Sequence, residues 1–489
     1  MSLTEQELVA KVPTKLYING KWVDGHGTGL ISVEDPATGK TITEIANANE
    51  VDGLLALSAA SEAQEAWANT APRERAEILR RTFDLVRARS EEFAMLISLE
   101  MGKPLAEARG EVTYGNEFLR WFSEEAVRIS GRYGVSPEGT GRMLITQRPV
   151  GPAFAITPWN FPLAMATRKI GPAIAAGCTM VVKPAELTPL TTLLLAATLE
   201  EAGLPAGVIN IITTKTSQAT SAPIIADPRL RKITFTGSTE VGVRLLEQSA
   251  KQVLRTSMEL GGNAPFLVFE DADIDAAVTG AMLAKLRNIG QACTAANRFI
   301  VHESIADEFA QKMAKQMQQM PLGRGLDPET KIGPVINEKA RENLLRLVNT
   351  TVAEGGGILT GGKAGAGAGY FFEPTVLVDV KPGSTILQEE IFGPVAPIVR
   401  FKTEDEAIRL ANDTVYGLVS YAYTQDLKRG LRLVEKLDTG MTGLNTGLVS
   451  NAAAPFGGVK QSGLGREGGL EGINEYLETK YVMIPDPSI

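Results

Sequence analysis

Between residues 150 and 258 the chain alternates short apolar runs with longer amphipathic ones. The apolar runs 150–157 and 178–183 are each followed by a proline, and we predict both to be buried strands. The same pattern predicts strands at 207–212 and 232–236 and helices at 164–176, 189–202 and 238–250, the last with Ser238 as its N-cap. Strands and helices that alternate at this spacing indicate βαβ units and a parallel sheet.

The alternation restarts after Glu259, which indicates a second α/β domain. Its first elements are a strand at 264–269, a helix at 274–288 and a strand at 298–301. Upstream of both domains, three long helical segments carry acidic and basic faces, and we expect them to cover the first domain. They are predicted at 51–67, 72–88 and 105–127.

Two further segments have the pattern of strands but belong to neither alternating series. Residues 131–149 alternate apolar and polar positions around a Pro-Glu-Gly-Thr-Gly turn and predict a projecting hairpin. Residues 476–484 predict a strand with no obvious partner in the sequence. Because unpaired strands present open backbone groups, we expect these segments to pair between subunits in a homodimer or homotetramer.

The composition excludes several classes of protein. The chain has 489 residues, 44% hydrophobic and 22% charged, which is typical of a globular enzyme of two or three domains. Its net charge of −8 argues against nucleic acid as a partner. The most apolar run, 170–182, is too short to cross a bilayer, so we expect no membrane association.

The counts of cysteine and histidine narrow the chemistry further. Two cysteines cannot form a disulfide framework, and the acidic start of the chain does not resemble a secretory signal, so we expect a cytoplasmic protein. With two cysteines and two histidines we expect no metal site. The shortage of histidine assigns base catalysis to Glu, Asp or Lys.

Cys293 and Glu259 are the first candidates for chemistry. Cys293 follows Gly-Gln-Ala at the end of a predicted helix, where it fits a nucleophile and a small buried side chain equally well. Cys178, inside an apolar run, is interpreted as core. Glu259 precedes Leu-Gly-Gly at the end of a strand, where it is either a mobile base or a solvated carboxylate. A thiol and a separate carboxylate suffice for covalent acyl chemistry.

Polar residues also follow three predicted strands of the first domain. Asn160 lies in Thr-Pro-Trp-Asn-Phe-Pro, where its amide either stabilises an oxyanion or forms an Asx-turn. Lys183 and Glu186 follow the next strand, and Gly237 and Ser238 open a helix whose N–H groups suit a pyrophosphate. No Gly-x-Gly-x-x-Gly motif occurs here. Ligands of open α/β sheets bind at such strand ends, so these residues predict one binding edge.

Seven motifs together resemble the aldehyde dehydrogenase superfamily over nearly the full length. They are Pro-Trp-Asn-Phe-Pro, Lys-Pro-Ala-Glu, Phe-Thr-Gly-Ser-Thr-Glu-Val-Gly, Glu-Leu-Gly-Gly-Asn, Gly-Gln-Ala-Cys, Glu-Glu-Ile-Phe-Gly-Pro and Pro-Phe-Gly-Gly. Within the family, Thr-Arg-Lys, Arg-Asn-Ile-Gly-Gln and Gly-Leu-Val-Ser-Asn look most like members that oxidise succinate semialdehyde.

The resemblance implies a role for each motif. Cys293 would attack the aldehyde carbon, Asn160 and the Cys293 N–H would form the oxyanion hole, and Glu259 would activate water to hydrolyse the thioester. Hydride would pass to a nicotinamide cofactor, and no metal is needed. The residues implied to hold that cofactor are Trp159, Lys183, Glu186, Gly237, Ser238, Glu390 and Phe392.

The resemblance also suggests how a substrate is chosen. Arg168, Arg287 and Ser450 occupy positions that look apolar or aromatic in members acting on simple aldehydes. Two guanidiniums and a hydroxyl would bind a carboxylate at the far end of a short semialdehyde. The alternative is that Arg168, next to Lys169, lies on a solvated helix face. We favour the first interpretation because the three residues occur together.

Two departures from close relatives affect regulation and cofactor. Ala295 replaces a second cysteine that would form a redox-sensitive disulfide, so we expect no such switch. Residues 211–220 lack the glycines usual near the adenine pocket. Glu186 would repel a 2′-phosphate and favours NAD, whereas Lys215 would attract one and favours NADP. We expect NAD.

These observations predict an α/β protein of three parts with the aldehyde dehydrogenase fold. Residues 1–130 and 150–258 would form a Rossmann-like NAD(P)-binding domain and 259–460 the α/β catalytic domain. Residues 131–149 and 461–489 would form a small β element for oligomerisation or bridging. The predicted function is oxidation of succinate semialdehyde, or a close ω-carboxy aldehyde, to the dicarboxylate. The alternatives are a dehydrogenase of uncharged aldehydes and a non-catalytic protein on the same fold.

Overall fold

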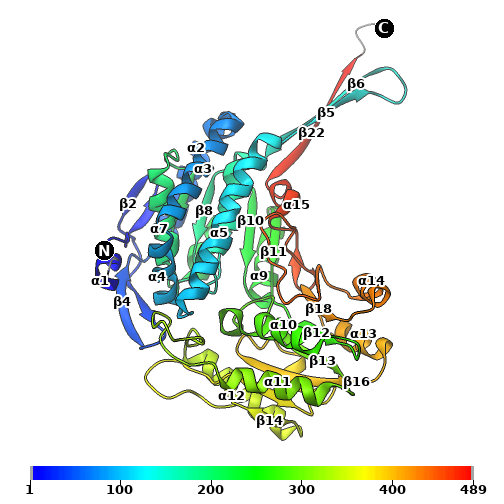
Figure 1. Cartoon of the computed structure of the whole chain (residues 1–489). Helices are drawn as coiled ribbons and strands as arrows, with labels where there is room; N and C mark the ends of the chain where they lie inside the picture. Colours follow the sequence, from blue (N-terminus) through cyan, green and yellow to red (C-terminus); the bar gives the residue numbers. More distant parts are fainter. Residues whose placement is uncertain (1–3, 486–489) are drawn as a thin grey trace.

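A computed structural model describes residues 4–485 of the chain. The first three residues of the predicted cofactor domain and the last four of the predicted β element therefore lie outside the described residues. Two large sheets with helices packed against them form the body, and a narrow three-stranded sheet projects away from it (Figure 1). Among the described residues no helix is both long and apolar enough to cross a membrane.

The first sheet has eight strands in the order β2-β1-β9-β8-β7-β10-β11-β21. Its five central strands, which are β9, β8, β7, β10 and β11, are parallel, as the alternating pattern predicted. The bounds are β1 Leu16–Ile18, β2 Lys21–Val23, β7 Ala153–Ile156, β8 Met180–Lys183, β9 Ile209–Ile211, β10 Lys232–Thr236, β11 Arg255–Glu259 and β21 Gly463–Leu464.

Helices cover both faces of this sheet. Their bounds are α1 Glu5–Val9, α2 Glu50–Asn69, α3 Pro72–Ala88, α4 Ser90–Met101, α5 Leu105–Glu125, η1 Ala126–Arg128, α6 Pro162–Ala176, α7 Leu190–Glu201, α8 Ser217–Ala226 and α9 Thr239–Ala250. Ser238 caps α9 as predicted, since its hydroxyl accepts from the N–H of Val241. The predicted helical cover is present, but α4 was not predicted. Eight of its twelve residues are buried, so its sequence lacks the alternation of apolar and polar positions by which an amphipathic helix is predicted.

The second sheet has seven strands in the order β14-β15-β16-β13-β12-β18-β19. Its strands are β12 Ala264–Val268, β13 Ala296–His302, β14 Gly357–Thr360, β15 Thr375–Val378, β16 Val395–Phe401, β18 Val419–Tyr423 and β19 Met441–Leu444. Its helical segments are α10 Ile274–Leu286, η2 Arg287–Gly290, α11 Ala306–Gln318, α12 Glu338–Ala353, η3 Thr385–Leu387, α13 Glu404–Asn412 and α14 Leu427–Lys436. The chain passes from the last parallel strand of the first sheet to the second sheet between Glu259 and Ala264.

The projecting sheet consists of β5 Arg132–Val135, β6 Gly141–Pro149 and β22 Leu477–Pro485, and is called the arm below (Figure 1). The predicted hairpin is present. The expectation that the C-terminal strand lacks a partner in the chain is wrong, because β22 pairs antiparallel with β6 along its whole length. Sequence patterns do not report pairing between strands more than 300 residues apart.

The segment before β22 has a different place from the arm. β21 adds an edge strand to the first sheet beside β11, and α15 Gly469–Asn474 packs near α5 and α6. Two small ribbons complete the fold, β3 Ile31–Asp35 with β4 Lys40–Ile45 and β17 Tyr416–Gly417 with β20 Val459–Lys460. Residues 461–475 therefore connect the second sheet to the first, ahead of the strand that enters the arm.

Candidate functional site

The carboxyl ends of the parallel strands in the first sheet open onto a cavity of about 470 Å³. Five of the residues predicted to bind a cofactor line it: Trp159, Lys183, Glu186, Gly237 and Ser238. They meet because β7, β8 and β10 are parallel neighbours, so the turns that follow them lie along one sheet edge.

The polar groups of this cavity are partly unsatisfied. Lys183 donates to the Ser217 hydroxyl at 3.2 Å, and burial lowers its pKa while Glu186 opposes the shift. The buried hydroxyls of Ser221 and Thr236 have no hydrogen-bond partner. A cavity with unused donors and acceptors beside the N-terminus of α9 suits a polar, anionic ligand.

A second cavity, of about 240 Å³, continues from the first and contains Cys293. Asn160, Glu390 and Phe392 also line it, and Trp159 and Gly237 are shared with the first cavity. The rings of Trp159 and Phe392 meet edge to face with centroids 5.5 Å apart. Residues from five different predicted motifs therefore surround one space.

The Cys293 thiol is half-buried and sits in an environment that disfavours its anion. Burial raises its pKa to about 12, the Arg168 guanidinium opposes the shift, and the carboxylates of Glu390 and Glu259 add to it. Cys178, by contrast, is fully buried, as its apolar surroundings predicted. Cys293 is thus the accessible cysteine, and attack requires its proton to leave.

Asn160 lies next to the thiol on the turn after β7. Its side-chain Nδ2 donates to the carbonyl of Gln291 at 3.0 Å, while its Oδ1 is buried without a partner. Gln291 is two residues before Cys293, so this bond joins the amide to the cysteine loop. The bond holds the Asn160 amide against the cysteine loop, in the cavity that Cys293 also lines.

Glu259 ends β11 and does not line the second cavity. It is buried, one carboxylate oxygen has no hydrogen-bond partner, and a Cβ on Gly457 would lie 3.0 Å from the other. Burial raises its pKa well above the ordinary value, and the nearby Glu467 raises it further. Glu259 is therefore a buried acid, and the alternative of a solvated carboxylate is wrong.

Two glycines after Glu259 allow the loop to reach the cysteine. A Cβ on Gly262 would lie 2.3 Å from the carbonyl oxygen of Cys293, so no other residue fits there without a backbone shift. The N–H of Gly262 donates to Glu390 at 3.1 Å. Burial raises the pKa of Glu390 to about 7, while this bond and Lys285 lower it.

A third cavity, of about 430 Å³, holds two of the three residues predicted to bind the substrate. Arg287 and Ser450 both line it, and Arg287 Nη1 donates to the Ser450 hydroxyl at 2.9 Å. The Arg287 guanidinium lies over the rings of Tyr114 and Phe161, at 5.6 and 5.2 Å from their centroids. These rings hold the charge in place at the cavity wall.

Arg168, the third of these residues, does not line that cavity. It is buried on α6, its Nη2 lies 2.5 Å from Glu467, and its guanidinium lies 4.0 Å from the centroid of the Phe456 ring. Its Nε has no acceptor. Lys169 is buried too, 2.5 Å from the same carboxylate. The alternative of a solvated helix face is wrong, because α6 is packed on all sides.

The sequence reasoning missed several residues of the site. Glu467, Lys103, Glu111 and Tyr114 were not predicted, although the last three line the cavity of Arg287. Glu111 and Tyr114 are three residues apart on α5 and so share a helix face. Glu107, one turn before Glu111, lines the same cavity, so carboxyl and phenol groups repeated at helical spacing were the available signal.

Lys215 and Glu186, the two residues expected to influence the choice between NAD and NADP, line different hollows of the surface. Lys215 lines an open hollow with Ser217 and Gln218, whereas Glu186 lines the first cavity. Ser217 and Gln218 border both, so the hollow adjoins the cavity.

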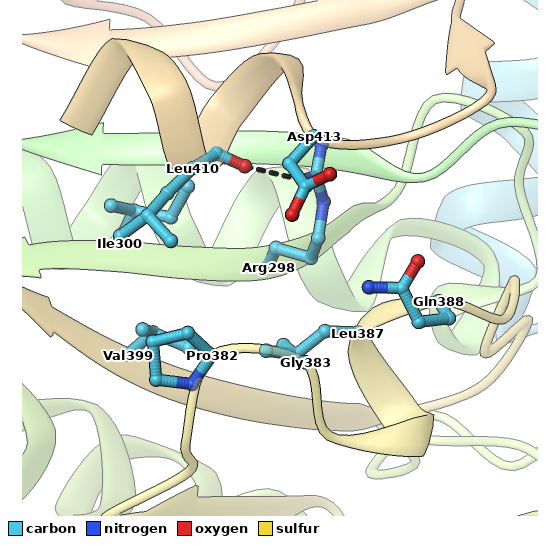
Figure 2. Close-up of a pocket in the computed structure, with 9 residues that line it drawn as sticks. All are labelled: Arg298, Ile300, Pro382, Gly383, Leu387, Gln388, Val399, Leu410 and Asp413. Carbon is cyan, nitrogen blue, oxygen red and sulfur yellow. Dashed lines mark hydrogen bonds between the residues drawn. The ribbon is translucent and has the colours of Figure 1, made fainter. Parts of the chain in front are cut away.

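Figure 2 shows a separate cavity beside strands of the second sheet, and none of the predicted site residues lines it. Its volume is about 20 Å³, enough for one water. Arg298 donates there to the carbonyls of Leu410 and Ala411, each at 2.8 Å, and to Asn263 at 3.0 Å. Arg298 therefore donates hydrogen bonds to carbonyls in the last turn of α13, and its role is structural.

Comparisons with known proteins agree with this arrangement. The aldehyde dehydrogenase family model matches residues 22–482. A succinate-semialdehyde dehydrogenase of Paenarthrobacter nicotinovorans is 60% identical over 446 residues, covering 91% of this chain and 99% of the relative. A glutarate-semialdehyde dehydrogenase of Pseudomonas aeruginosa is 46% identical, covering 96% of this chain and 97% of the relative.

A solved structure extends the match to the fold. The crystal structure of an Escherichia coli NADP-dependent enzyme superimposes with a TM-score of 0.96 at 45% identity, covering 99% of this chain and all of that one. The cavities, the accessible cysteine and the full-length match lead to the same conclusion: the chain belongs to the aldehyde dehydrogenase family.

Proposed function

We propose that the protein oxidises succinate semialdehyde, or its homologue glutarate semialdehyde, to the dicarboxylate with a nicotinamide dinucleotide. The observation that carries this proposal is the bond between Arg287 and Ser450 in the wall of the third cavity, whose residue Phe161 follows Asn160 of the Cys293 cavity in the chain. A guanidinium and a hydroxyl that already touch form a ready pair of donors for one carboxylate. The names of the relatives that act on semialdehydes support the same substrate class.

Two further groups strengthen this carboxylate site. Tyr114 Oη is buried in the same cavity without a hydrogen-bond partner, and burial raises the pKa of this phenol while the charges of Arg168 and Arg287 oppose the shift. The Nε of Arg168 lacks an acceptor. We assign Arg287 and Ser450 as the main carboxylate ligands, with Tyr114 as a third donor, while Arg168, which pairs with Glu467 outside the cavity, acts on the site through its charge.

The reaction follows from the residues around the thiol. Cys293 Sγ loses its proton to solvent and bonds to the aldehyde carbon, and the resulting alkoxide is stabilised by the amide of Asn160 and the N–H of Cys293. A nicotinamide held by the residues of the first two cavities would supply the hydride acceptor for the oxidation of this adduct to a thioester on Cys293. Glu259 then takes a proton from water as its oxygen attacks the thioester carbon, the C–S bond breaks, and Glu259 returns the proton to Cys293 Sγ while the acid leaves.

The first cavity suits the dinucleotide. Its unpaired Ser221 and Thr236 hydroxyls, Lys183 and the N-terminus of α9 match a ligand of hydroxyls and phosphates. We infer a preference for NAD over NADP, because Glu186 lines the cavity and would repel a 2′-phosphate, whereas Lys215 lies in the adjoining hollow.

The test is an initial-rate titration with NAD and NADP over aldehydes of two to six carbons. We expect kcat/KM to be highest for succinate or glutarate semialdehyde and lowest for uncharged aldehydes such as butanal. Equal values for succinate semialdehyde and butanal would support the alternative, a dehydrogenase of simple aldehydes. Full turnover by Cys293→Ala would contradict the whole mechanism.

A variant of Arg287 tests the carboxylate site itself. Arg287→Ala should raise KM for succinate semialdehyde by about 10–100-fold, since a charged hydrogen bond is worth about 1.5–3 kcal/mol. KM for butanal should change little, which makes the neutral aldehyde an internal control. Arg400→Ala removes an exposed arginine of β16 that pairs with Asp307, and should leave both values unchanged.

We also propose that the protein is a homodimer or homotetramer assembled through the arm. Both outer strands of the arm have an open edge, and its side chains are largely exposed. Tyr133 and Tyr481 are 65% and 56% exposed. Large exposed apolar side chains on open strands favour pairing with another subunit.

A further inference from the structure

A buried ion pair lies beside the site and has no role in the mechanism above. Lys103 Nζ and Glu111 Oε2 are 2.5 Å apart, and the two residues are 0% and 2% exposed. Lys103 lies between α4 and α5, and Glu111 lies on α5. Removing two charges from water is unfavourable unless further hydrogen bonds compensate, so the other partners of the pair are informative.

Each member of the pair has a second partner in the turn that carries Asn160. Lys103 Nζ donates to the Asn160 carbonyl at 2.8 Å. The other oxygen of Glu111 accepts from the N–H groups of Leu163 and Ala164, at 3.0 and 3.3 Å. Because the N-cap of α6 makes no side-chain hydrogen bond, Glu111 supplies the missing acceptor. The pair thus holds this turn at two points.

The side chain of Asn160 points in the direction that these bonds set. Asn288 Nδ2 also donates to the Asn160 carbonyl, at 3.0 Å, and to the carbonyl of Gln291 at 2.8 Å. Asn160 Nδ2 donates to that same Gln291 carbonyl. Lys103 and Asn288 therefore share the backbone of Asn160, and its amide extends from this anchored backbone to the cysteine loop.

Lys103 lines the substrate cavity, which raises the question whether it binds the substrate instead. Its ammonium group already contacts Glu111, Asn160 and the face of the Phe161 ring, whose centroid is 4.0 Å away. Three N–H donors facing three partners leave none for a carboxylate. Its charge is balanced within the protein, so a positioning role explains its contacts better.

We propose that Lys103 and Glu111 position the oxyanion hole, acting through Asn160. The proposal rests on the proposed function, because it requires Asn160 to stabilise an oxyanion. The pair orients the backbone of Asn160 so that the side-chain N–H groups face the oxygen of the carbonyl that Cys293 attacks.

The test uses an activated ester and no nicotinamide. In p-nitrophenyl acetate, Cys293 Sγ bonds to the carbonyl carbon, the ester C–O bond breaks, and p-nitrophenolate leaves with the electron pair while the thiol loses its proton to solvent. The pair is neutralised as Lys103→Met with Glu111→Gln, because a single change would leave a buried lone charge. No residue outside the pair is changed.

We expect the p-nitrophenolate burst to slow by about 10–100-fold, approaching the roughly 10²–10³-fold loss typical of a missing oxyanion donor. In an Asn160→Ala background the same double change should slow the burst less than about twofold, because residues that act through one group are not additive. Independent, multiplicative losses in the two backgrounds would overturn the proposal.

A matched control separates positioning from stability. Lys232 of β10 is also fully buried and bonds to Ser257, away from the Asn160 turn. Lys232→Met should lower the melting temperature as the double variant does, yet leave the burst rate unchanged. A similar slowing in Lys232→Met would overturn the proposal. Failure of the proposed substrate, in contrast, would appear in the aldehyde panel and leave the ester result intact.

Discussion

At the scale of single residues, the chemistry depends on two groups whose pKa values lie above their ordinary range. Burial raises the pKa of Cys293 to about 12 and that of Glu259 well above normal, with Glu467 adding to the second shift. Cys293 is therefore protonated in the resting protein at neutral pH, and Glu259 holds its proton more tightly than an ordinary glutamate does. Each group becomes reactive only when its proton is lost.

The raised pKa of Glu259 predicts the pH dependence of hydrolysis. The carboxylate is the form that accepts a proton from water, so turnover should increase with pH through this raised value, above the pH near 4.3 at which an ordinary glutamate ionises. Glu259→Gln should lower kcat by about 10²–10⁴-fold and remove this dependence. The measurement is a pH profile of kcat.

The p-nitrophenolate burst provides the control for that variant. Glu259→Gln should retain the burst, because the first acylation uses Cys293 and Asn160. A lost burst would show that Glu259 also activates the thiol, and an unchanged pH profile would show that another group titrates.

At the scale of elements, a short irregular segment places the thiol. α10 ends at Leu286, and the following turn holds Asn288 and Ile289 in left-handed conformation, with φ of 56° and 60°. Gly290 continues this conformation at 73°. Such residues are held by their surroundings. Here the Asn288 N–H donates to Glu107 at 2.5 Å, while its side chain bonds to Asn160 and Gln291.

Gly290 is the position in this segment where an added side chain is least tolerated. An added Cβ would lie 2.2 Å from the Gly393 carbonyl, so Gly290→Ala must move the backbone three residues before Cys293. We expect unfolding free energy to fall by about 2–5 kcal/mol and the thiol burst to be largely lost. Chemical denaturation and stopped-flow measurements check both.

Gly383 offers a matched comparison. Its φ is 86°, and a Cβ there would meet nothing within 4 Å. Gly383→Ala should therefore show only the strain of the left-handed conformation, about 1–2 kcal/mol, with an unchanged burst. Equal effects of the two variants would mean that the contact with Gly393 is unimportant.

At the scale of the whole molecule, the site is made where two sheets meet. β11 of the first sheet ends at Glu259, and β13 of the second begins just after the Cys293 loop. β21 and α15 then bring Glu467 back against α6. The arm extends from this body (Figure 1). Its two outer strands have open edges, and Tyr133 and Tyr481 on them are exposed.

The arm predicts the behaviour of the molecule in solution. The full chain should have a mass of two or four times 52.3 kDa by size exclusion with light scattering. Tyr133→Glu with Tyr481→Glu places charges on its exposed faces, and should shift the protein toward the monomer without changing its melting profile by far-UV circular dichroism. A monomeric wild type would contradict the assembly, and an unchanged mass of the variant would move the interface elsewhere.

The sequence by itself determined most strands and helices, because the periods of 2 and 3.6 are local properties of the chain. It also named the cysteine, the glutamate and the asparagine, since each lies in a motif at the end of an element. The predicted helix 72–88 and strand 232–236 agree with α3 and β10 to the residue.

Only the tertiary structure decided which charges meet. Lys169 and Glu467 are 298 positions apart, Lys103 and Asn160 are 57 apart, and β22 lies on β6 across more than 300 residues. Such pairs form because burial forces each charge or open strand to find a partner among whatever the fold brings near. That choice depends on packing in three dimensions, and no local pattern of the chain encodes it.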